Sequence, residues 1–195
     1  ILVLGSSGEF TGLTKQEKHD FFKFYADYTA GRTKLYAGTG SLNFEDTVAL
    51  SNEVNEMGYE GAMVIGPCYY ALDQEKIFVY YDTLAKSIKG NLYIYNFPAR
   101  SGHSIAPETL KKLVENNTNI KGLKDSVSEP NHTNELMPLY DMDSNFSLLF
   151  KKLMQHRGVE VLDRAIFPYN QMDEEVYKKA ESLMDKVIEE YQNLK

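Results

Sequence analysis

The chain has 195 residues, 43% of them apolar and 25% charged, which is the composition of a globular domain with one substantial core. Its net charge of -7 argues against a nucleic-acid partner, and no apolar run approaches the roughly 20 residues that a membrane-spanning helix needs. Cys68 is the only cysteine, so no disulfide can form within these residues, and we expect a reducing, cytoplasmic location.

Six short runs of strand-forming residues recur at intervals of roughly 30 residues, the length of one strand plus one helix. Most are apolar on consecutive positions, which is typical of parallel strands covered on both faces. The runs are Ile1–Leu4, Leu35–Ala37, Ala62–Ile65, Leu92–Phe97, Ile120–Leu123 and Phe146–Phe150.

Helical patterns fill the intervals between these runs. The side chains expected to cap or open the first four helices are Thr14 with Glu17, Asn43, Asp73 and Pro107. Gly31, Gly58 and Gly90 are expected to end the first three of them. Residues 173 to about 194 predict a long amphipathic helix at the end of the chain.

Repeated strand and helix units imply a parallel sheet, either an open doubly wound sheet or a closed barrel. The first turn, Gly5–Glu9, matches neither of the common glycine-rich phosphate loops, which favours the barrel. We therefore predict an α/β protein with a (β/α)8 TIM barrel and a C-terminal helical extension. Residues 1–150 would hold barrel strands 2 to 7, and residues 151–195 the helical segment.

The strand count of this predicted barrel is incomplete. Six strands are fewer than the eight of a closed barrel. The strand-like run Asn145–Phe150 also meets the helix-like run Lys151–Met154 with no turn residue between them. We therefore expect residues to be absent at this junction and before Ile1.

Catalytic residues of such barrels lie at the carboxyl ends of the strands, and one of the buried strands is followed there by Lys124. A desolvated, neutral amine can attack a ketone to form an imine. The protonated imine then accepts electrons while a carbon–carbon bond forms or breaks. Position alone leaves a second interpretation, commoner for lysines in general, in which the side chain extends from the barrel rim into solvent.

Other strand ends carry hydroxyl groups that would suit such an imine. Tyr95 is a candidate proton relay, although buried tyrosines more often serve packing. Ser6 and Ser7 lie in a glycine-flanked turn, where they could bind a carboxylate or serve the turn alone. The four histidines lack metal-ligand spacing and Cys68 lacks a second cysteine, so we predict neither a metal nor another cofactor.

Five strand-end motifs, in this order and spacing, resemble the dihydrodipicolinate synthase/N-acetylneuraminate lyase family. They are Gly5-Ser6-Ser7-Gly8-Glu9, Ala37-Gly38-Thr39-Gly40, Pro67-Cys68-Tyr69-Tyr70, Tyr95-Asn96-Phe97-Pro98-Ala99-Arg100 and Gly122-Leu123-Lys124-Asp125-Ser126. The resemblance runs from Ile1 to about Phe150, and the tail is also similar, with Arg164–Pro168 and a final helix. It implies an eight-stranded barrel, usually a homotetramer.

The resemblance also implies roles for single residues. Pyruvate would form its imine on Lys124, and Tyr95 would relay protons. The Ser6/Ser7 turn would bind the pyruvate carboxylate. Tyr69 matches a tyrosine that reaches a neighbouring subunit's active site to complete the relay. Arg100 matches the arginine that holds the carboxylate of the second substrate in the synthase.

Three functions are compatible with these residues. The leading hypothesis is dihydrodipicolinate synthase activity, the condensation of pyruvate with aspartate semialdehyde in lysine biosynthesis. Arg100 favours it, because a planar guanidinium suits a carboxylate, whereas Ala71-Leu72 stand where the synthase usually has a proline.

The second hypothesis is an aldolase that releases pyruvate from 2-keto-3-deoxygluconate or N-acetylneuraminate. The third is a non-catalytic binding protein on the same barrel, which the retention of both Lys124 and Tyr95 opposes. Under either enzyme hypothesis the expected partners are pyruvate, an aldehyde and further copies of the chain.

Overall fold

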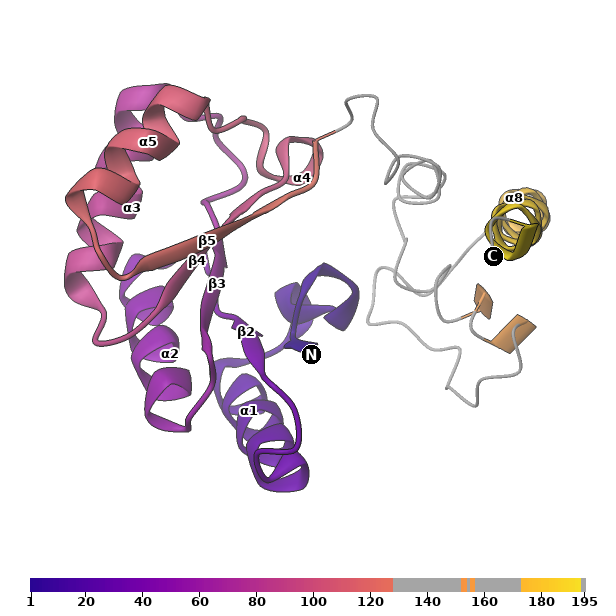
Figure 1. The fold of residues 1–195 in the computed structure, drawn as a ribbon, viewed down its shortest axis with the longest axis horizontal. Coiled ribbons are helices and arrows are strands. Elements are labelled where there is room, and N and C mark those ends of the chain that lie inside the picture. Colours follow the sequence, from indigo (N-terminus) through magenta and orange to yellow (C-terminus); the bar gives the residue numbers. More distant parts are fainter. Residues whose placement is uncertain (128–151, 154, 157–172, 194–195) are drawn as a thin grey trace. The chain divides into compact units, whose positions relative to one another are not determined.

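The computed structural model describes residues 1–127, 152–153, 155–156 and 173–193 (Figure 1). The chain divides into two compact units. The first comprises Ile1–Gly5 and Leu13–Val127, and the second comprises Ser6–Gly12 and Ser128–Lys195. The predicted boundary at residue 150 stays a prediction, because it lies outside the described residues.

The first unit is built on a parallel sheet whose described strands are β1 (Leu2–Val3), β2 (Tyr36–Gly38), β3 (Gly61–Ile65), β4 (Leu92–Asn96) and β5 (Ile120–Asp125). The strands lie side by side in sequence order, and every neighbouring pair is parallel. The sixth predicted strand, Phe146–Phe150, lies outside the described residues.

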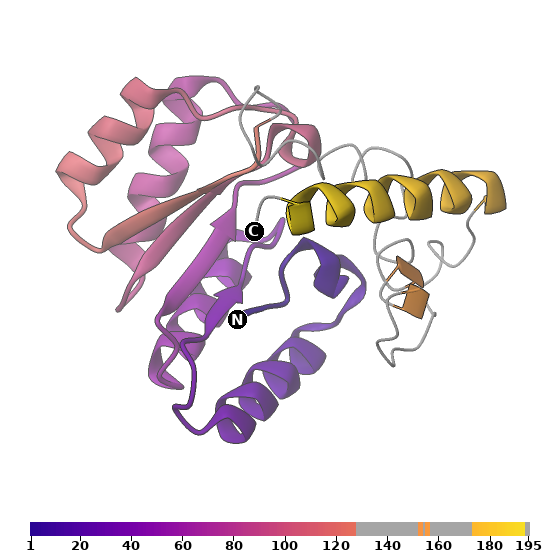
Figure 2. The ribbon, with the colours of Figure 1, turned by 45° about the vertical axis from the view of Figure 1, so that its right-hand side comes forward.

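Five helices accompany these strands. They are α1 (Lys15–Thr29), α2 (Phe44–Glu56), α3 (Gln74–Ser87), the short α4 (Pro98–Ser101) and α5 (Pro107–Asn116). Helices α2, α3 and α5 lie on the same face of the sheet in both Figure 1 and Figure 2. A doubly wound sheet reverses its strand order and carries helices on both faces. Sequential strands with helices on one face are instead the arrangement of a barrel, as predicted.

The predicted start signals of the helices are confirmed. The Thr14 side chain accepts from the backbone N–H of Glu17, whose carboxylate in turn accepts from the backbone N–H of Thr14, a complete capping box. Asn43 and Asp73 cap α2 and α3 through their side chains, and Pro107 occupies the first turn of α5.

Some predicted boundaries differ from the structure. Strand β1 stops at Val3 because Leu4 adopts a left-handed conformation with a φ of 53°. Helix α1 ends at Thr29, and its C-cap is the left-handed Ala30, one residue before the glycine expected to end the helix. Helix α4 was not anticipated from the sequence: it begins directly after Phe97, with Pro98 in its first turn.

The core of the first unit lies between the sheet and its helices. It consists of strand and helix side chains that are at most 1% exposed: Ala37, Ala62, Val64, Leu92 and Ile94 from the strands, with Phe22, Leu50, Val54, Ile77, Tyr81, Leu84 and Leu113 from the helices. Full burial of one such side chain contributes about 1.5–3 kcal/mol. This core therefore fixes the sheet on which the candidate site is built.

The opposite face of the sheet carries aromatic side chains. Successive residues of a strand point to opposite faces, so Tyr93 and Tyr95 of β4 share this face. Gly61 and Gly122 flank Tyr93 on the neighbouring strands, and a Cβ atom at Gly61 would come within 2.9 Å of the Tyr93 ring. The two glycines therefore provide the space for this ring, which meets Tyr36 edge to face at 5.0 Å.

The second unit contains α8 (Glu174–Asn193), in the place of the predicted terminal helix. Leu153 and Ala180 are fully buried against each other, with Tyr177, Leu183 and Met184 packed around them. His156 adds polar contacts to the same helix, at 3.2 Å from the Glu181 carboxylate and 3.1 Å from that of Asp185.

Candidate active site

Lys124 and Tyr95 form the centre of the candidate site. They are directly opposite partners in the β4–β5 ladder, at the carboxyl ends of both strands. The Lys124 Nζ lies 3.4 Å from the centroid of the Tyr95 ring and donates to the Ser126 Oγ at 3.3 Å. Tyr95 is only 7% exposed, whereas Lys124 is half-buried. The lysine therefore lies across a buried aromatic ring and does not extend freely into solvent.

Phe97 and Arg100 continue this arrangement beyond the end of β4. The Tyr95 and Phe97 rings lie 5.6 Å apart with a 30° tilt, and the Arg100 guanidinium lies 6.0 Å from the Phe97 ring centroid. Helix α4 positions Arg100, and its first backbone hydrogen bonds return to the carbonyl of Phe97. Two cations and two aromatic rings thus follow one another in the order Lys124, Tyr95, Phe97, Arg100. The structure brings three predicted site residues together and adds Phe97.

A second set of contacts lies one residue further along the same two strands. Asn96, which is 3% exposed, pairs with Asp125, and its Nδ2 donates to the Asp125 carboxylate at 2.9 Å. Its Oδ1 accepts from the backbone N–H of Ile105 at 3.1 Å, and its backbone carbonyl accepts from the N–H of Ser126 at 2.8 Å. No local sequence pattern indicates these contacts, because the side-chain partners of Asn96 are 9 and 29 residues away in the chain.

Tyr69 is placed in a turn after β3. It has a φ of 102° and is 85% exposed, and its ring meets that of Tyr70 edge to face at 4.8 Å. A non-glycine residue with such a φ is strained, and such strain is concentrated at functional sites. Tyr69 is therefore an exposed side chain on a strained backbone turn. Its predicted role stays a prediction.

Ser6 and Ser7 form a short 3-10 helix, Ser6–Gly8, within the second compact unit. The turn expected from the glycine-flanked serines is thus present. Ser7 is exposed and Ser6 is half-buried. Their predicted contact with pyruvate stays a prediction.

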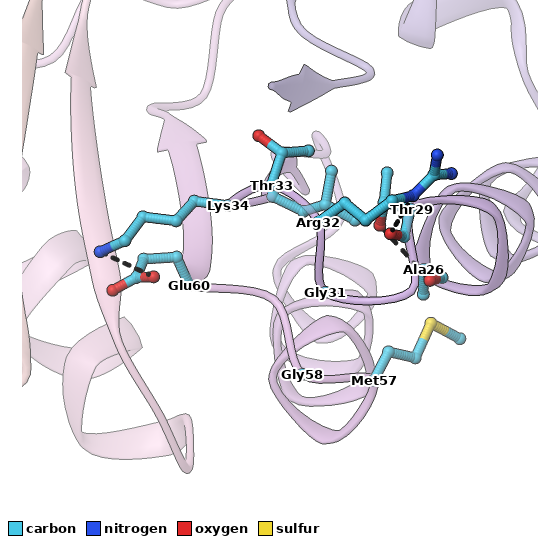
Figure 3. A pocket seen from close by; sticks show the side chains of 10 residues that line it. Ala26, Thr29, Gly31, Arg32, Thr33, Lys34, Met57, Gly58 and Glu60 are labelled. Atoms are coloured by element: carbon cyan, nitrogen blue, oxygen red, sulfur yellow. Dashed lines mark hydrogen bonds and ion pairs between the residues drawn. The ribbon is translucent and has the colours of Figure 1, made fainter.

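A separate hollow of about 410 Å³ lies at the amino ends of β2 and β3 (Figure 3). Its charged groups are already engaged: Lys34 pairs with Glu60 at 3.2 Å, and the Arg32 guanidinium donates to the carbonyls of Tyr28 and Thr29. Parallel strands place this hollow at the opposite end of the sheet from the carboxyl ends where Lys124 and Tyr95 lie. The hollow is therefore not part of the candidate site.

Among residues 1–127, 152–153, 155–156 and 173–193, no three histidine, cysteine or acidic side chains gather as a metal site would require. Within the same ranges, no helix has both the length and the apolar character needed to cross a bilayer.

Sequential parallel strands, helices on one face and a lysine at a strand end define the class of protein, a (β/α)-barrel fold with its candidate chemistry at the carboxyl ends of the strands. Residues 1–149 match the model of the Dihydrodipicolinate synthetase family, and the chain belongs to that family. The predicted family resemblance is thus confirmed.

Relatives with two different activities match the chain. The 4-hydroxy-tetrahydrodipicolinate synthase of Kosmotoga olearia is 34% identical over 139 residues, which are 71% of this chain and 47% of that protein. The putative 2-dehydro-3-deoxy-D-gluconate aldolase YagE of Escherichia coli is 31% identical over 137 residues, 70% of this chain and 45% of that protein. The chain thus spans about half the length of these relatives.

Solved structures share the fold. The crystal structure of YagE from Escherichia coli in complex with pyruvate has a TM-score of 0.81 at 21% identity, covering 95% of this chain and 85% of that one. Dihydrodipicolinate synthase from Thermotoga maritima has a TM-score of 0.80 at 16% identity, with the same coverage. These likenesses confirm the predicted barrel class. The described part of the chain holds five of its strands.

Proposed function

We propose that the protein is a pyruvate-dependent lyase in which Lys124 forms an imine with pyruvate. The observation that carries this proposal is the position of the Lys124 amine, at a strand end and 3.4 Å from the centroid of the buried Tyr95 ring. Membership of a family whose relatives are named as synthases and an aldolase supports it. These contacts oppose the solvent-exposed alternative for Lys124.

The proposed first step uses groups of the site. The Lys124 amine attacks the pyruvate ketone, the new carbon–nitrogen bond becomes an imine, and the ketone oxygen leaves as water. Tyr95 carries protons between the amine and that oxygen, because its hydroxyl belongs to the ring beneath the amine. Ser6 and Ser7 bind the pyruvate carboxylate.

The second substrate is aspartate semialdehyde, so the overall reaction is that of 4-hydroxy-tetrahydrodipicolinate synthase. Arg100 supports this choice, because its guanidinium lies on the Phe97 ring at the end of the lysine–aromatic series. A forked guanidinium there suits a carboxylate that pyruvate does not supply. The matched synthases, including that of Kosmotoga olearia, agree with this substrate.

Sugar-acid cleavage is the second candidate function. The identity with the putative aldolase YagE, 31%, is close to that with the synthase, and Ala71-Leu72 stand where the synthase usually has a proline. The same imine would serve this reaction, but Arg100 would then meet a substrate hydroxyl or carboxylate of the sugar acid.

The assembly is a homo-oligomer, a tetramer, in which Tyr69 reaches the active site of a neighbouring copy. The 85% exposure of Tyr69 and its strained backbone support this role. An exposed tyrosine ring is available to be covered by a second copy of the chain. A cytoplasmic location is part of the same proposal.

The decisive test is reduction of the imine in place. Borohydride added with pyruvate should leave a carboxyethyl group on the peptide that contains Lys124. Lys121→Gln is the matched control, since Lys121 lies on the same strand, is exposed and should not be needed. Lys124→Gln should abolish the adduct. An unmodified Lys124 peptide in folded wild-type protein would rule out the imine.

The choice of second substrate needs its own comparison. Pyruvate-dependent consumption of aspartate semialdehyde should exceed the release of pyruvate from sugar acids. The reverse order would identify the protein as an aldolase.

A further inference from the structure

We propose that Asn96 is a positioning residue that fixes Lys124 against Tyr95 and ties this pair to the segment that carries Arg100. The inference rests on the proposed function, because it assigns a task to Asn96 only if Lys124 is the nucleophile. Nothing about Asn96 in the sequence pattern required such a task. It emerges from three contacts that join separate parts of the fold.

The first two contacts hold the end of β5. The Asn96 Nδ2 donates to the Asp125 carboxylate at 2.9 Å, and the Asn96 carbonyl accepts from the Ser126 N–H at 2.8 Å. Lys124 is the residue immediately before Asp125 and also donates to the Ser126 Oγ. The two residues that follow Lys124 in the chain are thus held by one residue of β4.

The third contact holds the segment beyond β4. The Asn96 Oδ1 accepts from the Ile105 N–H at 3.1 Å, which closes the segment 97–104 that contains α4 and Arg100. The Asn96 amide therefore donates to β5, the strand of the proposed nucleophile. It accepts from the segment that carries Arg100, the residue proposed to bind the second substrate.

The geometry of the ladder explains how this affects the nucleophile. Tyr95 pairs with Lys124 and Asn96 pairs with Asp125, as two successive rungs. Side chains of successive strand residues point to opposite faces. The Asn96–Asp125 pair is therefore on the reverse side of the sheet from the Lys124–Tyr95 pair. A shift of the second rung moves the first, because both rungs share the same two backbones.

Only an amide side chain can both donate to Asp125 and accept from the Ile105 N–H at this position. Asn96 is 3% exposed, and a buried polar group must find partners for its donor and acceptor alike. An aspartate would still accept from Ile105, but it would set a second carboxylate against Asp125. Asn96→Asp combined with Asp125→Asn restores a donor and an acceptor on the correct sides. The charge then moves from the exposed position 125 to the buried position 96, where the Ile105 N–H and the new amide at position 125 donate to it.

The chain contains a matched pair for comparison. Asn117, which is 5% exposed, donates its Nδ2 to the Asp82 carboxylate at 2.9 Å, the same distance as in the Asn96–Asp125 pair. It precedes β5 and so belongs to the amino end of that strand, away from Lys124. Asn117→Asp likewise sets a second carboxylate against an aspartate, here one that also pairs with Lys86 at 2.6 Å, without touching the rung beside the nucleophile.

The experiment measures the rate at which pyruvate and borohydride label Lys124, at several pyruvate concentrations and pH 8. Asn96→Asp should lower the maximal labelling rate on the order of 10- to 100-fold, the scale for misplacing a reacting group by about 1 Å. The pyruvate concentration at half-maximal rate should hold, because the Ser6/Ser7 turn is unchanged. Asn117→Asp should lower the melting temperature about as much as Asn96→Asp does, but Lys124 should still be labelled at the wild-type rate.

The double variant separates positioning from mere loss of structure. Asn96→Asp with Asp125→Asn should return the rate to near the wild-type value. Two results would overturn the inference while leaving the imine intact, provided that wild type is labelled. One is a folded double variant in which Lys124 is still labelled slowly. The other is labelling of Lys124 in Asn96→Asp as fast as in Asn117→Asp. If folded wild type forms no adduct, the proposed function fails and the inference fails with it.

Discussion

Replacing Tyr95 by phenylalanine should separate the hydroxyl group of this side chain from its ring. The centroid of the Tyr95 ring lies 3.4 Å from the Lys124 Nζ and 5.6 Å from the centroid of the Phe97 ring. Phenylalanine retains both contacts. Loss of the hydroxyl alone should cost about 1 kcal/mol in the free energy of unfolding. The variant should therefore fold, with Lys124 still in place.

Turnover should respond far more strongly than stability. Acid–base catalysis by one side chain contributes roughly 100-fold or more, which corresponds to about 2.7 kcal/mol in the activation free energy. Tyr95→Leu removes the ring as well, so the surface that holds the Lys124 side chain in place is also lost. Lys124 labelling should then fall further in Tyr95→Leu than in Tyr95→Phe.

The assay combines steady-state condensation with borohydride trapping, so that turnover and imine formation are read on the same preparations. Tyr93→Phe is the matched control, because Tyr93 shares the strand and the face but lies two residues nearer the amino end. It should keep wild-type turnover. Unchanged turnover in Tyr95→Phe would show that Tyr95 serves packing alone and refute its role as a proton relay.

Four further outcomes are expected. Arg100→Ala should weaken use of aspartate semialdehyde by about 1.5–3 kcal/mol in kcat/KM while Lys124 labelling holds, and equal losses in both would indicate a structural role. Gly38→Ala should destabilise the fold by about 1–3 kcal/mol in urea unfolding, because its Cβ would collide with the Leu4 carbonyl oxygen. Thr14→Ala should cost about 1 kcal/mol through loss of the α1 cap, measured in the same way. Burial lowers the pKa of His103, so the unfolded chain binds a proton more readily than the folded chain. The free energy of unfolding should therefore fall as the pH drops below about 6.5. In His103→Gln, the free energy of unfolding should depend less on pH in this range.

The sequence alone was sufficient for most of the elements of the first unit and for the class of fold. Apolar runs about one strand-and-helix unit apart predicted the five described strands, and the capping residues Thr14, Asn43 and Asp73 predicted where three helices begin. These signals are local, since a cap or a buried strand depends on residues within a few positions. The lysine and tyrosine at strand ends could be selected for the same reason, because parallel strands bring their carboxyl ends to one edge of the sheet.

Tertiary structure decided what each of these residues contacts. The register of β4 and β5 sets Lys124 opposite Tyr95, and no local pattern specifies that register. The same register gives Asn96 its contacts with Asp125 and Ile105, and the unanticipated helix α4 brings Arg100 onto Phe97. Such contacts depend on the packing of segments far apart in the chain, where burial and hydrogen-bond geometry select among partners that the sequence leaves equivalent.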